Sequence, residues 1–123
     1  MANARTDPKR GLEENLKRAV TEMLVLNLLN QQDMHAPQIM QSLEEGSKGA
    51  LTLVSPYMLF YRLIEGGYIL EAYKKAALDG RRRQYYQITA EGRKYLADLI
   101  VIYRRIIDGI ELLLGEEGKA SEP

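Results

Sequence analysis

The chain has 123 residues, no cysteine and a formal net charge of zero, with 17 Lys and Arg against 17 Asp and Glu. This length predicts one domain with a modest core, of a size that often buries more surface by pairing. The absence of cysteine excludes a disulfide framework, a thiol nucleophile and a zinc finger, and makes a reducing cytoplasm the expected compartment. No apolar run is long enough to cross a membrane, and no signal peptide is visible.

Basic residues are concentrated in one stretch of this neutral chain. Between Lys74 and Lys94 there are seven Lys and Arg residues and only two acidic residues, Asp79 and Glu91. A local excess of positive charge attracts phosphates even where the whole chain is neutral. We therefore expect this stretch to contact nucleic acid.

The N-terminal third is predicted to contain an arm, a helix and a loop. Residues 1–11 are polar and include Pro8 and Gly11, which predicts a loose arm. From residue 12 to residue 30, apolar residues recur at helical spacing and become denser towards the end. This pattern predicts a helix whose second half is deeply buried, and residues 31–34 are expected to form a loop.

Two shorter helices follow, each with a proline near its start. The first of them is predicted at about residues 37–45, with Pro37 at its first position. His35, the single histidine, is expected to be a hydrogen-bonded residue before this helix, because a metal or catalytic role lacks partners. The next helix is predicted at residues 55–65, with the Ser55 hydroxyl as a cap before Pro56. Its buried face is Leu59, Phe60 and Leu63, and its outside or borders are covered by Tyr57, Met58, Tyr61 and Arg62.

A β-hairpin is predicted around the turn dipeptide Asp79-Gly80, with strands at residues 68–73 and 81–88. Tyr86 and Ile88 are expected on its inward face. Thr89 is placed to cap the following helix, where Glu91 in the first turn favours the helix dipole. The basic residues at the hairpin tip are Lys74, Lys75, Arg81, Arg82 and Arg83.

The last helix is predicted from about residue 90 to residue 114 and carries a heptad pattern. Its apolar positions from Leu96 onwards step alternately by three and four residues. Such a stripe suits a partner helix; the alternative is that the helix folds back on its own domain. We favour self-association, through Leu99, Tyr103, Ile106, Ile110 and Leu113.

The order of these elements predicts a mainly α-helical fold with a β-hairpin (α+β), a winged helix-turn-helix followed by a long helix. Residues 12–92 would form the DNA-binding domain and residues 93–114 the dimerisation helix, with flexible tails at 1–11 and 115–123. In this architecture the third helix enters the major groove and the wing lies on the adjacent backbone. No catalytic constellation is present, so we expect no enzyme activity and no cofactor or metal.

The sequence resembles the PadR family of bacterial transcriptional regulators over about residues 16–114. The resemblance is strongest at residues 80–93, GRRRQYYQITAEGR, which look like that family's wing signature. Supporting matches are Leu24-Val25-Leu26, Leu28-Leu29, His35, Ile39, Tyr57, Leu59, Tyr61-Arg62-Leu63, Gly67 and Ile69. The single final helix looks like the shorter branch of the family, which includes multidrug-responsive repressors.

The chain departs from the family pattern at three places. Ala36-Pro37 follows the histidine where the family usually has Gly-Tyr, and Met58 stands where proline is common. Pro56 lies where the family's helix is normally under way, and it predicts a later helix start. These departures leave the DNA register and the operator sequence open.

These features together favour a homodimeric, ligand-responsive repressor that binds double-stranded DNA. The first alternative is a winged-helix dimer that binds proteins and has lost DNA binding; a cofactor-dependent enzyme is a distant third. The expected effector is a planar hydrophobic or phenolic molecule at the dimer interface, held by Met23, Leu99, Ile100 and Tyr103. The expected DNA contacts are Ser55, Tyr57, Arg62, Lys74, Lys75, Arg81, Arg82 and Arg83.

Overall fold

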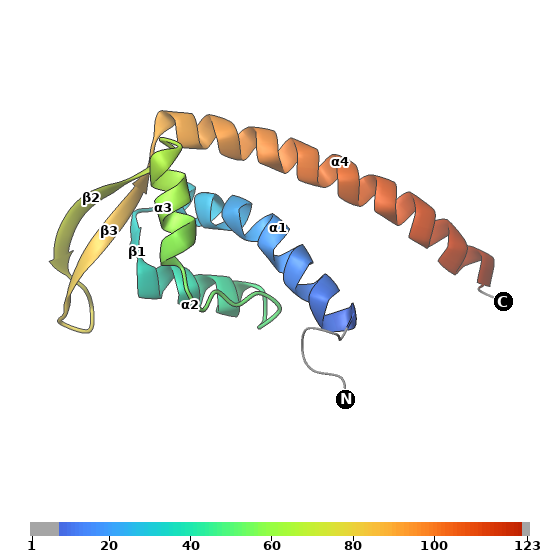
Figure 1. Cartoon of the computed structure of the whole chain (residues 1–123), viewed down its shortest axis with the longest axis horizontal. Helices are drawn as coiled ribbons and strands as arrows, with labels where there is room; N and C mark the ends of the chain where they lie inside the picture. The colour runs from blue at the N-terminus through green and yellow to red at the C-terminus, as the bar shows by residue number, and fades with distance from the viewer. Residues whose placement is uncertain (1–7, 122–123) are drawn as a thin grey trace.

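The computed structural model describes the backbone of residues 8–121 and the side chains of residues 8–115. Short helices and a β-hairpin gather at one end of the molecule, and a long final helix extends away from them (Figure 1). The chain is therefore mainly α-helical with a small sheet, as the sequence predicts. The elements are α1 (Pro8–Gln31), β1 (Met34–His35), α2 (Ala36–Gly46), α3 (Tyr57–Glu65), β2 (Ile69–Ala76), β3 (Arg82–Ile88) and α4 (Ala90–Ser121).

One hydrophobic core joins the second half of α1 to α2, α3 and the base of the hairpin. Its fully buried side chains are Val25, Leu26, Ile39, Phe60, Leu63 and Ile69. Tyr86 and Ile88 on β3 are buried in the same cluster, which confirms the inward face predicted for that strand. Leu96 near the start of α4 also belongs to the core, so α4 is anchored to the domain at its beginning.

The sheet has three antiparallel strands in the order β1-β3-β2, whereas the sequence predicts only a hairpin. Met34 pairs with Tyr86 and His35 with Tyr85. The sequence predicts a loop at residue 34, because a two-residue strand is too short to show any alternation. Its pairing with a distant strand is decided only when the chain folds.

Both terminal helices are longer than the sequence predicts. α1 begins at Pro8 rather than at residue 12, and α4 continues to Ser121 rather than ending at Leu114. Proline is accepted in the first turn of a helix, and the added segments are rich in helix-forming Lys, Arg and Glu. The remaining parts of the predicted tails, residues 1–7 and 122–123, lie outside the described residues.

The prediction that Ser55 caps α3 is wrong. Pro56 occupies the cap position with helical backbone angles, φ −80° and ψ −18°, and no side chain caps the helix. The Pro56 carbonyl accepts the first helical hydrogen bond, from Phe60 N at 3.0 Å. Ser55 therefore lies one residue too early, and α3 starts at Tyr57.

The cap of α4 is confirmed and also joins α4 to the end of α3. Thr89 Oγ1 accepts a hydrogen bond from Gly92 N at 2.9 Å and donates one to the Gly67 carbonyl at 2.6 Å. Thr89 N donates to the Tyr68 carbonyl at 3.0 Å. These bonds fix the direction in which α4 leaves the domain.

Candidate nucleic-acid interface

The wing is the hairpin of β2 and β3, which projects from the helical core (Figure 1). Its turn is closed by a hydrogen bond from Ala77 N to the Arg81 carbonyl at 2.8 Å, with Gly80 at a φ of +82°. Asp79-Gly80 thus forms the predicted turn, since glycine adopts a positive φ without strain. Lys74, Arg81 and Arg82 are exposed around this turn.

Arg83 differs from the other wing bases because it is paired. Its Nη2 donates a hydrogen bond to Asp79 Oδ2 at 2.9 Å, while Asp79 Oδ1 accepts one from Arg81 N at 3.0 Å. The Arg83 hydrogen bond, assisted by the one from the Arg81 backbone, lowers the pKa of the Asp79 carboxyl below its ordinary value. Arg83 therefore supports the turn, and part of its charge is already compensated.

An aromatic cluster on the outer face of the wing holds Lys75. Tyr73 and Tyr85 stack with ring centroids 5.2 Å apart, and the Lys75 ammonium lies 4.8 Å from the Tyr85 centroid. The Tyr73 hydroxyl donates to Asp33 Oδ2 at 2.8 Å. This cluster is not predicted by the sequence. Its only signal is the adjacent pair Tyr85-Tyr86, where strict alternation would give one polar residue.

The outward face of α3 is aromatic and apolar. Tyr57 is 63% exposed, and its ring meets the buried Phe60 ring in an edge-to-face arrangement, with centroids 6.0 Å apart. Met58 and Tyr61 are also exposed. Tyr57 lines a crevice of about 180 Å³ together with His35 and the wing residues Arg82 and Arg83. The fold therefore brings Tyr57 together with two of the wing bases, Arg82 and Arg83.

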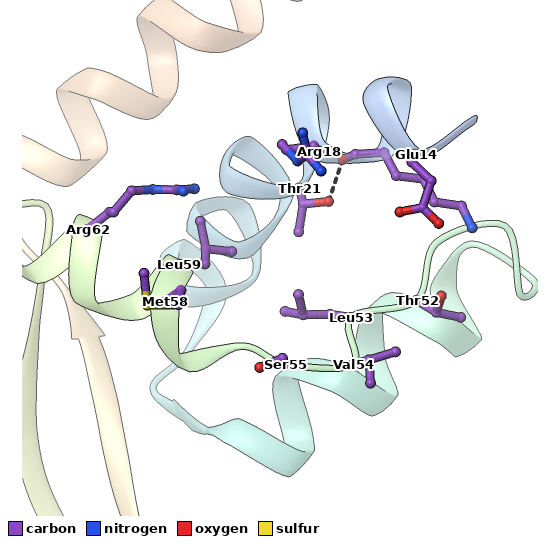
Figure 2. Close-up of a pocket in the computed structure, with 11 residues that line it drawn as sticks. Glu14, Arg18, Thr21, Thr52, Leu53, Val54, Ser55, Met58, Leu59 and Arg62 are labelled. Carbon is purple, nitrogen blue, oxygen red and sulfur yellow. Dashed lines mark hydrogen bonds between the residues drawn. The ribbon is translucent and has the colours of Figure 1, made fainter. Parts of the chain in front are cut away.

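Ser55 and Arg62 lie on the other flank of α3. They line a cleft of about 350 Å³ between α1 and the segment before α3, together with Arg18 and Met58. Figure 2 shows the Arg62 side chain extended from α3 towards α1. Its Nη2 lies 3.9 Å from Glu22 Oε2. The structure does not bring these two predicted DNA contacts together with Tyr57 and the wing.

A second concave surface lies between α1 and α4, with a volume of about 320 Å³. Met23, Leu99 and Tyr103 line it together, as do Ile106 and Ile110 of the predicted seam. Ile100 is not among the lining residues; it packs against the core. Leu113 is 75% exposed farther along α4. The groove also contains three polar residues that the sequence analysis did not single out, Arg18, Glu22 and Tyr95.

The described part of the chain holds no group of three or more His, Asp and Glu residues placed to bind a metal ion. Within the same residues, no helix has the length and apolar composition needed to span a membrane.

A helical core with a β-hairpin wing and an exposed third helix defines the winged helix-turn-helix class. The chain belongs to the PadR-like family of transcriptional regulators, whose family model matches residues 25–98, more than half of the sequence. That family consists of regulators rather than enzymes.

Solved structures of bacterial regulators have the same fold. A PadR family regulator from Eggerthella lenta is 26% identical, with a TM-score of 0.68, and the match covers 92% of this chain and 94% of that one. A PadR-like regulator from Bacillus cereus is 23% identical, with a TM-score of 0.69 and coverage of 81% and 96%. A Streptococcus transcriptional regulator is 22% identical, with a TM-score of 0.69 and coverage of 80% and 95%.

Proposed function

We propose that this chain is a homodimeric, sequence-specific DNA-binding repressor that acts in the cytoplasm. In this proposal α3 enters the major groove and the wing lies along the adjacent backbone. The observation that carries it is the shared surface of α3 and the wing. Tyr57 and Arg82 line one crevice, and Lys74 and Arg81 are exposed beside the turn.

The wing residues have distinct roles in this proposal. Lys74, Arg81 and Arg82 are exposed and bind phosphates directly, and Lys75 does so from its position above the tyrosine rings. Arg83 holds the turn through Asp79 and reaches a phosphate only by exchanging that partner. Each phosphate contact releases counterions, so affinity falls with added salt.

The test measures the salt dependence of binding to the DNA upstream of the protein's own gene, by fluorescence anisotropy. Replacing both Arg81 and Arg82 by Ala removes two phosphate contacts and should flatten the slope of log K against log salt by roughly two. The matched control replaces Arg104 and Arg105, which are exposed on α4, by Ala. An unchanged slope in the wing variant would refute the phosphate role.

A winged-helix dimer that binds proteins instead of DNA is the second candidate function. It is favoured by the outward face of α3, where Met58 and Tyr61 are exposed and the single base, Arg62, lies beside Glu22. A folded dimer in light scattering that shifts neither its upstream DNA nor a random duplex in a gel would support this candidate.

The dimer interface is proposed to be the seam of α4. Ile106 is 51% exposed in the single chain although it lies in an apolar stripe. Leu12 and Leu16 on α1 are exposed as well, and Leu16 lines the same groove as Ile106. A second copy of the chain would cover this surface by contact of α4 with α4 or with α1 of the partner.

The groove between α1 and α4 is the proposed effector site for a planar hydrophobic or phenolic molecule. Met23 and Leu99 supply apolar walls, and Tyr103 offers a ring for offset stacking. The ligand would relieve repression by favouring one spacing of the two α3 helices in the dimer. Planar aromatic compounds should change tyrosine fluorescence and DNA binding in the wild type more than in Tyr103→Ala. Equal responses would remove Tyr103 from the site.

A further inference from the structure

Glu22 is the one carboxylate that joins α1, α3 and α4 among the described residues. It lies in the buried half of α1, and its side chain is 26% exposed. Its Oε1 accepts a hydrogen bond from the Tyr95 hydroxyl of α4 at 2.9 Å. Its Oε2 lies 3.9 Å from Nη2 of Arg62 on α3. Each carboxylate oxygen therefore faces a different helix.

Tyr95 is itself held firmly at the start of α4. Its ring stacks on Tyr68 with centroids 4.1 Å apart and an interplanar angle of 10°. Burial raises the pKa of the Tyr95 hydroxyl to about 12, and the hydrogen bond to Glu22 adds to this effect. The hydroxyl consequently remains a proton donor to Glu22 at any physiological pH.

The two partners of Glu22 open onto different surfaces. Glu22 and Tyr95 line the groove between α1 and α4, whereas Arg62 lines the cleft beside α3 (Figure 2). Core packing of Leu59, Phe60 and Leu63 fixes the inner side of α3. On the flank of α3 that faces α1, Arg62 makes the charged contact between the two helices, with its side chain 58% exposed.

We propose that Glu22 is a positioning residue for α3. It restrains the helix through Arg62, and through Tyr95 it couples this restraint to the groove between α1 and α4. The inference rests on the proposed DNA-binding function of α3. A molecule or partner helix that displaces Tyr95 from Glu22 would change how Arg62 is held. Freed from Glu22, Arg62 would instead add a sequence-independent attraction to phosphates.

The test compares Glu22→Gln, Tyr95→Phe and the double variant in the full chain. The measured quantity is the ratio of affinities for upstream DNA and for a random duplex. A purely structural loss lowers the folded fraction and leaves this ratio unchanged. We expect Glu22→Gln to lower it about tenfold and Tyr95→Phe to lower it less, a size typical of coupling between sites.

Because both contacts are made by Glu22, the effects of the two substitutions on the affinity ratio should be non-additive. Tyr95→Phe should lower the ratio in the wild type and have no effect in the Glu22→Gln background. Glu13→Gln is the matched control, because it removes an ion pair of similar length, 3.8 Å to Lys17 on the exposed side of α1. An unchanged ratio in Glu22→Gln, or an equal effect of Tyr95→Phe in both backgrounds, would overturn the proposal.

A second readout separates this proposal from the proposed function. Amide hydrogen exchange of α3 measures how firmly the helix is held without any DNA. Exchange should be about two- to fivefold faster in Glu22→Gln and faster in Tyr95→Phe, but unchanged in Glu13→Gln. If the wild type binds no specific DNA but α3 exchanges in this pattern, the positioning role of Glu22 is supported and the proposed DNA-binding function is refuted. Equal exchange of α3 in the wild type and in all variants would refute the positioning role of Glu22.

Discussion

The His35 ring contacts both the start of α2 and Tyr85 of β3, so its protonation should make both contacts depend on pH. Its Nδ1 accepts a hydrogen bond from Gln38 N at 3.3 Å, which confirms the predicted hydrogen-bonded residue before α2. The ring also lies perpendicular to the Tyr85 ring in an edge-to-face arrangement, with centroids 5.2 Å apart. Burial, followed by the Arg83 charge, lowers the pKa of His35 below the ordinary histidine value of 6.5.

We predict that the fold loses stability in mild acid through this residue. The unfolded chain binds a proton more readily than the folded one, because burial and the Arg83 charge disfavour the protonated ring. A protonated Nδ1 also cannot accept the capping bond. The stability contribution is therefore present above about pH 6.5 and is lost as pH falls through the folded pKa. The melting temperature should fall between pH 7.5 and pH 5 more in the wild type than in His35→Asn, which keeps a capping side chain. A parallel fall in both proteins would exclude His35 as the cause.

Tyr57 is expected to act at the surface rather than in the core. Because Tyr57 is 63% exposed, Tyr57→Ala should lose little packing beyond the edge-to-face contact with Phe60, which is worth about 0.5–1.5 kcal/mol. DNA affinity should fall about tenfold or more, since a hydroxyl and a ring would leave the protein–DNA interface. Thermal unfolding and anisotropy on the same samples separate the two effects. A chain that unfolds would show that Tyr57 is a core residue.

At the scale of elements, the junction between the wing and α4 depends on a glycine. A Cβ built on Gly92 would overlap the Tyr68 carbonyl oxygen and lie 2.7 Å from Ile88 Cγ1. Neither neighbour can move freely, since the carbonyl is backbone and accepts the Thr89 N–H. The start of α4 therefore packs directly against Tyr68, the residue that precedes the wing.

Gly92→Ala should cost about 3 kcal/mol or more, because overpacking against backbone forces the helix away. Gly109→Ala is the matched control on the same helix, since its added Cβ meets nothing described within 4 Å apart from its chain neighbours and the nearby helix backbone. That variant should gain roughly 0.5–1 kcal/mol from helix propensity. Chemical denaturation of both variants measures the difference. Similar stability in the two would mean that α4 can shift at its start.

At the scale of the whole molecule, the exposed stripe of α4 predicts obligate pairing. Burying such side chains contributes about 1.5–3 kcal/mol each, so two charges on the stripe should disrupt the dimer. Ile106→Glu combined with Ile110→Glu should give monomer or unfolded chain in light scattering. Arg104→Glu with Arg105→Glu introduces the same two glutamates on the exposed side of that helix and should remain dimeric. A well-folded dimer with both seam changes would place the interface elsewhere.

The sequence by itself determined the kinds of element and their order. The spacing of apolar residues, the Asp79-Gly80 turn and the Thr89 cap each depend on a few neighbouring residues, so they can be recognised in the sequence. The wing signature likewise indicated the family. Predictions from local sequence were wrong where tertiary packing outweighed them. At the start of α3, the buried Pro56 occupies the helix cap position that was expected for Ser55.

Only the tertiary structure decided which charged and apolar residues meet. Arg62 pairs with Glu22, and Tyr73 bonds Asp33, across 40 residues in each case. Met23 and Leu99 share a groove from which the neighbouring Ile100 is turned away. Such contacts depend on the rotation and crossing of whole helices, which the packing of many side chains sets together. The spacing of apolar residues along one helix does not specify how that helix packs against the others.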